Sequence, residues 1–225
     1  MGVEVPEAVI NDKTFKYLFT NEGGVKGTIR LLKNIMGLWL NQQCRQQWKK
    51  EGFELEYTQV PEMALAAKPF AGHINCNDSR FLAPGDMPSR INAYLKETGQ
   101  QTTQDKGQML RIVLESLSMN YRWVLERIEE ILNKKIDVLH MVGGGSQNYL
   151  FCQFIADAIG RKVITGPIEA TASGNIIMQA IATGQVGSLA AAREIVGKSF
   201  ETKEYLPMDT EVWQKQYQKV KHIFE

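Results

Sequence analysis

The sequence lacks an excess of charge of either sign. Among its 225 residues, 26 lysines and arginines stand against 25 aspartates and glutamates, so the formal net charge is +1. Proteins that hold nucleic acid or anionic membranes by electrostatic attraction carry a clear basic excess. The charge balance therefore gives no support to a nucleic-acid or membrane partner.

Cysteine is scarce, and long apolar runs are absent. Cys44, Cys76 and Cys152 lie far apart, and none belongs to a Cys-x-x-Cys pair, which disfavours a zinc site. No stretch approaches the roughly 18 apolar residues of a transmembrane helix, and the N-terminus has no basic or apolar signal region. The histidines are scattered without a His-Glu-x-x-His motif, so no metal site is expected. We expect a soluble cytoplasmic protein with free thiols.

What the sequence does contain is the pattern of an α/β protein. Hydrophobic residues make up 44% and charged residues 23%, which is ordinary for a globular domain. Alternation and short apolar runs predict strands at 15–19, 136–142 and 162–165. Helical spacing of apolar residues predicts helices at 27–50 (with a kink at Gly37), 58–67, 87–98, 103–132, 149–159, 171–182, 189–196 and 210–224. Long helices with short buried strands and strand-glycine-helix turns indicate the α/β class.

A run of three glycines, Gly143, Gly144 and Gly145, lies between a predicted strand and a predicted helix. Such a turn lets the backbone approach a ligand, and the following helix start offers free N–H groups. Packing alone also produces turns of this kind. The P-loop pattern is missing, and the dinucleotide fingerprint fits poorly because Asn148 occupies its third small position and Glu169 is misplaced. A Rossmann-type dehydrogenase is thus disfavoured.

Several segments resemble the FGGY family of carbohydrate kinases. Those that resemble its C-terminal domain are His140-Met-Val-Gly-Gly-Gly-Ser-Gln-Asn148, Phe154–Gly160 and Gly166–Asn175. Those that are similar to the rhamnulokinases of that family are Phe19–Gly24, Arg30–Trp39 and Arg80–Met87. The similarity extends from about residue 10 to residue 200.

This resemblance implies a fold and an activity. The family has two actin-like, ribonuclease H-like domains of the hexokinase ATPase type, with ATP and sugar in the cleft between them. Residues 1–225 would be the C-terminal domain without its first strand. The N-terminal sugar-binding domain, the phosphate-binding hairpin and the catalytic aspartate would be missing. The complete enzyme would transfer a phosphoryl group from ATP to the 1-hydroxyl of L-rhamnulose, and the chain alone would be inactive and carry no catalytic base. Mg²⁺ would be held mainly by the nucleotide phosphates.

The resemblance also implies roles for individual residues. Asn34 matches a position that reaches the sugar, and Gln42 matches a nucleotide contact. Gly143, Gly144 and Gly145 match the adenosine-binding turn, and Asn148 matches an amide on the adenine side, where it could donate and accept. If the helix at 27–50 is unbroken, Asn34 and Gln42 share one face.

Two alternatives stay open. The sugar could be another ketose, as in xylulokinases or fuculokinases, or the chain could bind nucleotide or assemble without catalysis. A missing first strand would also expose a strand edge and favour self-association.

Overall fold

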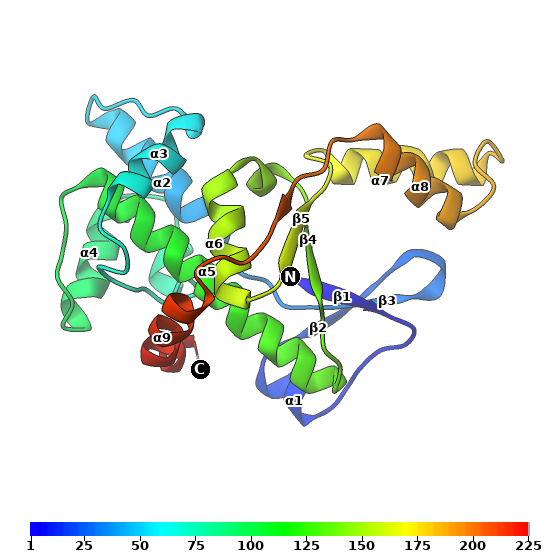
Figure 1. The fold of residues 1–225 in the computed structure, drawn as a ribbon, viewed down its shortest axis with the longest axis horizontal. Helices are drawn as coiled ribbons and strands as arrows, with labels where there is room; N and C mark the ends of the chain where they lie inside the picture. Colours follow the sequence, from blue (N-terminus) through cyan, green and yellow to red (C-terminus); the bar gives the residue numbers. More distant parts are fainter. Residues whose placement is uncertain (225) are drawn as a thin grey trace.

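The first residues form a small antiparallel sheet in the computed structural model, which describes residues 1–224 (Figure 1). β1 (Gly2–Val5) and β2 (Thr20–Gly23) pair on either side of β3 (Ile29–Leu32), each over four residues. Alternation along β3 buries Leu31 completely and leaves Arg30 exposed. The sheet thus has β1 and β2 as its edge strands.

The chain between β1 and β2 is helical, so the strand expected at 15–19 is wrong. α1 (Asp12–Lys16) begins at a capping box in which the Asn11 side chain accepts from the Thr14 backbone N–H. Leu18, with φ at +55°, ends the helix in the left-handed conformation. Phe15 is 84% exposed whereas Phe19 is buried, so the alternating aromatic residues do not form one face.

The second sheet has the order β4-β5-β6 and is mixed. β4 (Val138–Met141) runs parallel to β5 (Lys162–Thr165), and β6 (Glu204–Tyr205) pairs antiparallel with β5. The strands predicted at 136–142 and 162–165 are therefore confirmed. β4 is less buried than expected, because His140 is exposed and only Met141 is buried.

Helices make up most of the molecule, and most of them occur where their periodicity predicts them. The α-helices after α1 are α2 (Trp39–Lys50), α3 (Val60–Ala66), α4 (Met87–Glu97), α5 (Lys106–Leu132), α6 (Tyr149–Ile159), α7 (Ala170–Ala182), α8 (Leu189–Ser199) and α9 (Thr210–Val220). Single 3₁₀ turns are η1 (Val25–Gly27), η2 (Tyr57–Gln59), η3 (Ser79–Phe81), η4 (Gly144–Gln147) and η5 (Lys221–Phe224).

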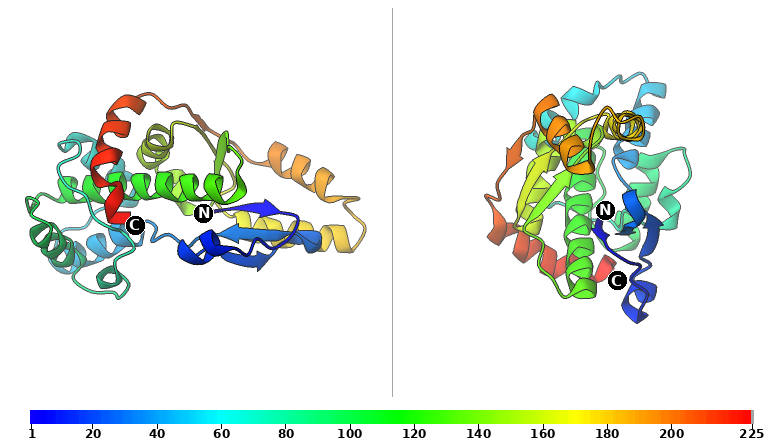
Figure 2. Two further views of the ribbon diagram at one scale, coloured as in Figure 1. Left: turned by 90° about the horizontal axis from the view of Figure 1, so that it is seen from below. Right: turned by 90° about the vertical axis from the view of Figure 1, so that its right-hand side faces the viewer.

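α5 is the centre of the core. Figure 2 shows this helix in the middle of the molecule in both views, with the N-terminal sheet along one side. Asp105 caps its start by accepting from the Gln108 N–H, and Asn133 ends it with φ at +49°. Every residue from 109 to 120 is buried, because α3 and α6 pack against the helix. This stretch of α5 is therefore the interface at which α3 and α6 are held together.

The helix expected at 27–50 begins only at Trp39. Residues 29–32 form β3, and 33–38 are a loop, so Gly37 is not a kink within a helix. Ile29 and Leu32 match a helical period, but Ile29 and Leu31 match a strand period equally well. Pairing with strands on both sides decides in favour of the sheet.

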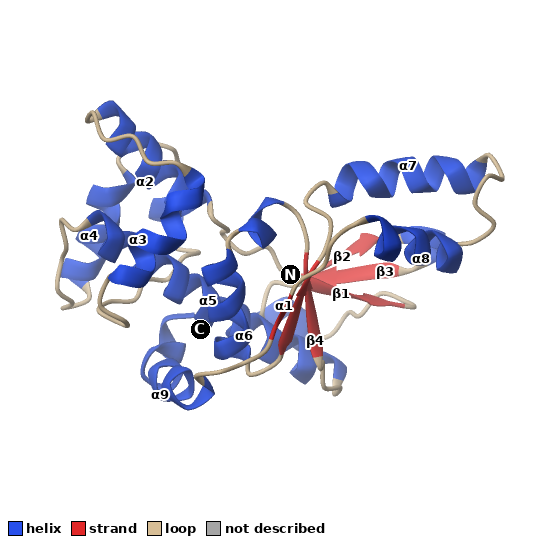
Figure 3. Cartoon of the chain, turned by 45° about the horizontal axis from the view of Figure 1, so that its top comes forward, coloured by secondary structure: helices blue, strands red, loops and turns tan. Residues whose placement is uncertain are grey.

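α7 and α8 project from the molecule as an arm (Figures 1 and 3). α7 contains no buried residue, and α8 buries only Ala192. An ion pair of 2.9 Å between Arg193 and Glu4 joins α8 to β1. Within residues 1–224, no helix combines the length and the apolar character needed to cross a bilayer.

Candidate nucleotide-binding site

The glycine turn follows β4 directly and is fixed from both ends. Gly143 has φ at +80°, a conformation that glycine adopts without strain. Its N–H donates to Pro167 O at 3.0 Å, and its carbonyl accepts from Ser146 Oγ at 2.7 Å. A Cβ on Gly145 would come within 2.9 Å of Met141 Cε, whereas one on Gly144 would meet nothing within 4 Å. Gly144 therefore borders open space, as a backbone that receives a ligand must.

Asn148 caps the helix that follows the turn. Its Oδ1 accepts from the Phe151 N–H at 2.9 Å, and the residue is 1% exposed. Its Nδ2 has no partner among residues 1–224. The expected two-way contact with a purine is thus reduced to donation, because the acceptor oxygen already serves the helix.

Gln42 lies in the first turn of α2, where its side chain is exposed. It borders a cavity of about 400 Å³ whose other lining residues are Arg45, Gln46, Lys49, Glu54, Leu55 and Glu56. The cavity lining is polar and charged apart from Leu55, and it contains both signs of charge.

Arg45 and Tyr57 connect this cavity to the glycine turn. The Arg45 guanidinium donates to Leu55 O at 2.6 and 2.8 Å and lies 5.8 Å from the centroid of the Tyr57 ring. The Tyr57 hydroxyl donates to Gly144 O at 3.4 Å. Burial raises the pKa of Tyr57, which keeps this donor protonated. Gln42 and Gly144 therefore belong to one continuous surface.

Asn34 lies apart from the helix of Gln42. It is exposed in the loop between β3 and α2, so the two residues do not share a helical face and that expectation is wrong. Among residues 1–224, no hydrogen bond joins Asn34 to Gln42 or to the glycine turn. The break comes from residues 29–32, which leave the helix to join the first sheet.

Sequence reasoning missed Arg45 and Tyr57. Arg45 follows Gln42 by three positions on one helix, and this spacing places both on the same face. Tyr57 gives no such signal, because its contact with Gly144 joins residues 87 positions apart.

The residues around the glycine turn and α2 supply hydrogen-bonding and charged groups. Within residues 1–224, no group of three or more His, Cys, Asp or Glu is placed to hold a metal ion. Glu115 has its pKa raised to about 7 by burial, against the opposing effects of the Arg111 hydrogen bond and charge. Its carboxylate bonds to Arg111 at 2.7 Å and to the Phe70 N–H at 2.8 Å inside the core, so it serves the fold.

The glycine turn and α2 both lie within a stretch that matches a family of known proteins. Residues 1–183 match the FGGY family of carbohydrate kinases, C-terminal domain. This chain belongs to the FGGY family. The resemblance inferred from the sequence is thereby confirmed.

Rhamnulokinases are among the relatives of this FGGY chain. It is 42% identical over 217 residues to Rhamnulokinase of Bacteroides thetaiotaomicron, a match that covers 96% of this chain and 44% of the relative. It is 37% identical over 209 residues to Rhamnulokinase of Bacillus subtilis, a match that covers 93% of this chain and 42% of the relative. The expected similarity to rhamnulokinases is confirmed, and the chain spans less than half the length of these curated relatives.

Solved structures of FGGY-like kinases share the fold. Xylulose kinase from Rhodospirillum rubrum superposes with a TM-score of 0.67 at 16% identity, covering 99% of this chain and 44% of that one. Plasmodium falciparum glycerol kinase with ADP superposes with a TM-score of 0.58 at 14% identity, and the match covers 87% of this chain and 38% of that one. The mixed helix and sheet architecture and these neighbours confirm the expected class, an α/β, ribonuclease H-like domain of the actin and hexokinase ATPase type.

Proposed function

We propose that this chain is the nucleotide-binding, C-terminal part of a sugar kinase that transfers the γ-phosphoryl group of ATP to the 1-hydroxyl of L-rhamnulose. The observation that carries the proposal is the 42% identity to a rhamnulokinase over 96% of the chain. The partner would be an N-terminal half that binds the sugar and supplies the base. In this assignment residues 1–225 form one domain.

The nucleotide would lie against Gly144 and Gln42. The space beside Gly144 admits a ligand, and the free Nδ2 of Asn148 needs an acceptor. Mg²⁺ would be held mainly by the nucleotide phosphates, and Asn34 would reach the sugar from its exposed loop. A solved structural neighbour contains ADP, which supports the choice of nucleotide.

Phosphoryl transfer requires positioning, charge stabilisation and a group that takes the hydroxyl proton. This chain would supply the wall for the adenosine and would exclude water on that side. Gln42, Arg45 and Tyr57 are neutral or cationic and cannot act as a carboxylate base. The Gln42 cavity also has Glu54 and Glu56, of which Glu54 pairs with Lys49, and in this proposal the catalytic base comes from the N-terminal half. We therefore expect the chain alone to release no ADP with L-rhamnulose and MgATP.

Calorimetric titration with ADP tests the nucleotide site. A Gly144→Val variant should lose binding, because the added side chain fills the space that the nucleotide needs. Gly187→Val is the matched control, since a Cβ there also meets nothing within 4 Å and its φ is not positive. Binding that survives Gly144→Val, or is lost equally in the control, would contradict the site.

A chimera tests the reaction. The chain is joined to the N-terminal portion of the Bacteroides thetaiotaomicron relative and assayed with L-rhamnulose, D-xylulose and L-fuculose. Preference for L-rhamnulose is the expected result. Preference for another ketose would mean that this sugar, and not L-rhamnulose, is the substrate. A folded chimera that binds ADP but phosphorylates none of the three sugars would favour a non-catalytic role.

A further inference from the structure

A second cavity lies between α1, the residue after β3, the loop before α4, and the second half of α5. It has a volume of about 390 Å³ and shares no lining residue with the glycine turn or the cavity at Gln42. It is lined by Lys16, Tyr17, Leu18, Lys33, Asn75, Asn77, Trp123, Arg127 and Phe224. Three of these residues are cationic and none is acidic.

Two of the cations have no carboxylate partner among residues 1–224. The Lys33 ammonium uses one of its three protons to donate to Tyr17 O at 2.8 Å, and it lies 5.9 Å from the Trp123 ring centroid. Burial lowers the pKa of Lys33, which shows that its charge is poorly compensated. Lys16 lies 5.2 Å from the Tyr17 ring centroid. These two residues leave about two positive charges at the cavity.

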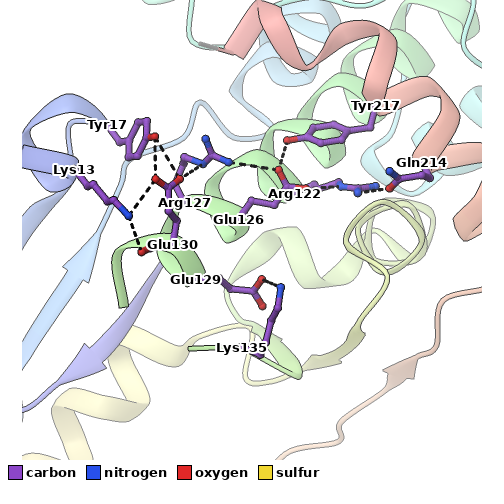
Figure 4. A network of polar contacts seen from close by, with 10 residues as sticks. All are labelled: Lys13, Tyr17, Arg122, Glu126, Arg127, Glu129, Glu130, Lys135, Gln214 and Tyr217. Carbon is purple, nitrogen blue, oxygen red and sulfur yellow. Dashed lines mark hydrogen bonds and ion pairs between the residues drawn. The ribbon is translucent and has the colours of Figure 1, made fainter. Parts of the chain in front are cut away.

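Arg127 is paired with two carboxylates, and the buried donor without a partner is the nearby Trp123 indole. Glu130 approaches Arg127 Nε at 3.4 Å and Glu126 approaches its terminal guanidinium nitrogen at 3.8 Å (Figure 4). Trp123 is 5% exposed, and its Nε1 has no partner within residues 1–224. A buried donor without an acceptor is costly, so this nitrogen indicates that an acceptor is to be supplied.

The two asparagines add further donors. Asn75 Oδ1 accepts from the Asn77 N–H at 3.0 Å, and Asn77 Oδ1 accepts from the Met36 N–H at 3.0 Å. Because both carbonyl oxygens are occupied, each side chain has its NH₂ group left to offer. The polar side chains around the cavity thus offer donors almost exclusively.

We propose that this cavity binds the phosphate group of a small phosphorylated molecule. A phosphate monoester carries close to two negative charges and three terminal oxygens, which match the two lysines without a carboxylate partner and the donors on the lining residues. A carboxylate offers one charge and two oxygens and would leave donors unsatisfied. The rings of Tyr17, Trp123 and Phe224 provide an apolar wall for the remainder of the ligand. The inference goes beyond the proposed kinase reaction and does not depend on it.

Nuclear magnetic resonance of the indole N–H groups tests this site with inorganic phosphate as the probe. The chain has four tryptophans and therefore four indole signals, and Trp123→Phe identifies the one that matters. Phosphate should shift the Trp123 indole signal and leave the other three indole signals in place. Phosphate that leaves the Trp123 signal unchanged, or that shifts all four signals alike, overturns the proposal.

Calorimetry with variants supplies the second measurement. Lys33→Met should weaken phosphate binding by about tenfold or more, because a charge-assisted hydrogen bond is lost. Lys215→Met, at an exposed position of α9, is the control for charge and should bind as the parent does. Gly144→Val should also leave phosphate binding unchanged, which separates this site from the nucleotide site. Equal affinity for acetate, or loss of binding in the Lys215 control, contradicts the proposal.

Discussion

The two ends of the Asn148 side chain have different surroundings. Its oxygen caps α6 through the Phe151 N–H, and its nitrogen is buried without a partner among the described residues. One residue thus combines the cap of a helix with a buried, unpaired donor directly after the glycine turn. Substitutions can separate the two roles, because serine keeps a capping oxygen and removes the amide nitrogen.

Asn148→Ala should lower the free energy of unfolding by about 1 kcal/mol, the usual effect of losing an N-cap. Asn148→Ser should lower the free energy of unfolding clearly less, because serine keeps a capping oxygen. If the amide nitrogen donates to the nucleotide, both variants weaken ADP binding to a similar extent. Urea unfolding and calorimetry measure the two effects. Equal stability of the alanine and serine variants would contradict the capping role.

At the scale of elements, local patterns predicted well those helices whose ends carry their own signals. Asp86 and Asp105 cap α4 and α5 near their predicted starts, and Gly160 ends α6. Residues 29–32 carry no such signal, and their state depends on pairing with strands that precede them. The glycine turn was visible because three glycines between a strand and a helix are a local feature. The contact of Tyr57 with Gly144 is tertiary, so no local pattern indicates it.

The loop between α3 and α4 is held to α5 by a buried polar cluster. The Arg111 guanidinium donates to the carbonyls of Ala64, Leu65 and Ala67 and pairs with Glu115 at 2.7 Å. Glu115 accepts from the N–H of Phe70, whose ring lies 6.3 Å from that of His73. His73 is buried, and its Nδ1 has no partner among residues 1–224. Two titratable groups of opposite behaviour therefore occupy one small region.

We expect Glu115 and His73 to have opposing effects on the pH dependence of stability. Burial raises the pKa of Glu115 from 4.5 to about 7, so the folded state binds its proton more tightly and this contribution to stability falls as pH rises through that range. Burial, with a smaller effect of the Lys219 charge, lowers the pKa of His73 from 6.5 to about 4. The unfolded chain then binds that proton more tightly, and the His73 contribution is lost as pH falls from 6.5 to 4.

Single substitutions should reveal each trend. Glu115→Gln should make the free energy of unfolding rise more steeply with pH between about 4.5 and 6.5, since only the His73 trend remains. His73→Asn should make the free energy of unfolding fall as pH rises through the same range, since only the Glu115 trend remains. Urea unfolding at a series of pH values measures both slopes. If the free energy of unfolding of both variants depends on pH in the same way as that of the parent chain, neither group titrates as described.

At the scale of the whole molecule, burial is distributed unevenly. α5 is buried along most of its length, whereas the arm formed by α7 and α8 buries one residue. Ile176 on α7 is 67% exposed, and the Arg193 to Glu4 ion pair that joins the arm to β1 is itself exposed. An exposed ion pair adds little stability, so the arm is held mainly by its covalent connections to β5 and β6. Opening of the arm should therefore require less free energy than global unfolding.

Hydrogen exchange at the backbone amides tests this difference. Amides of α7 and α8 should exchange far faster than those of α5 and α6, because opening the arm exposes little apolar surface. Glu4→Gln should leave exchange in α5 unchanged and alter exchange in the arm only slightly, since it removes an exposed ion pair.

Repeating the experiment over a range of protein concentrations separates local stability from association. Protection of α7 equal to that of α5 in dilute solution would contradict the prediction. Protection that appears only at high concentration would instead indicate that a second copy covers the arm or pairs with an edge strand of one of the two sheets, which are β1, β2, β4 and β6.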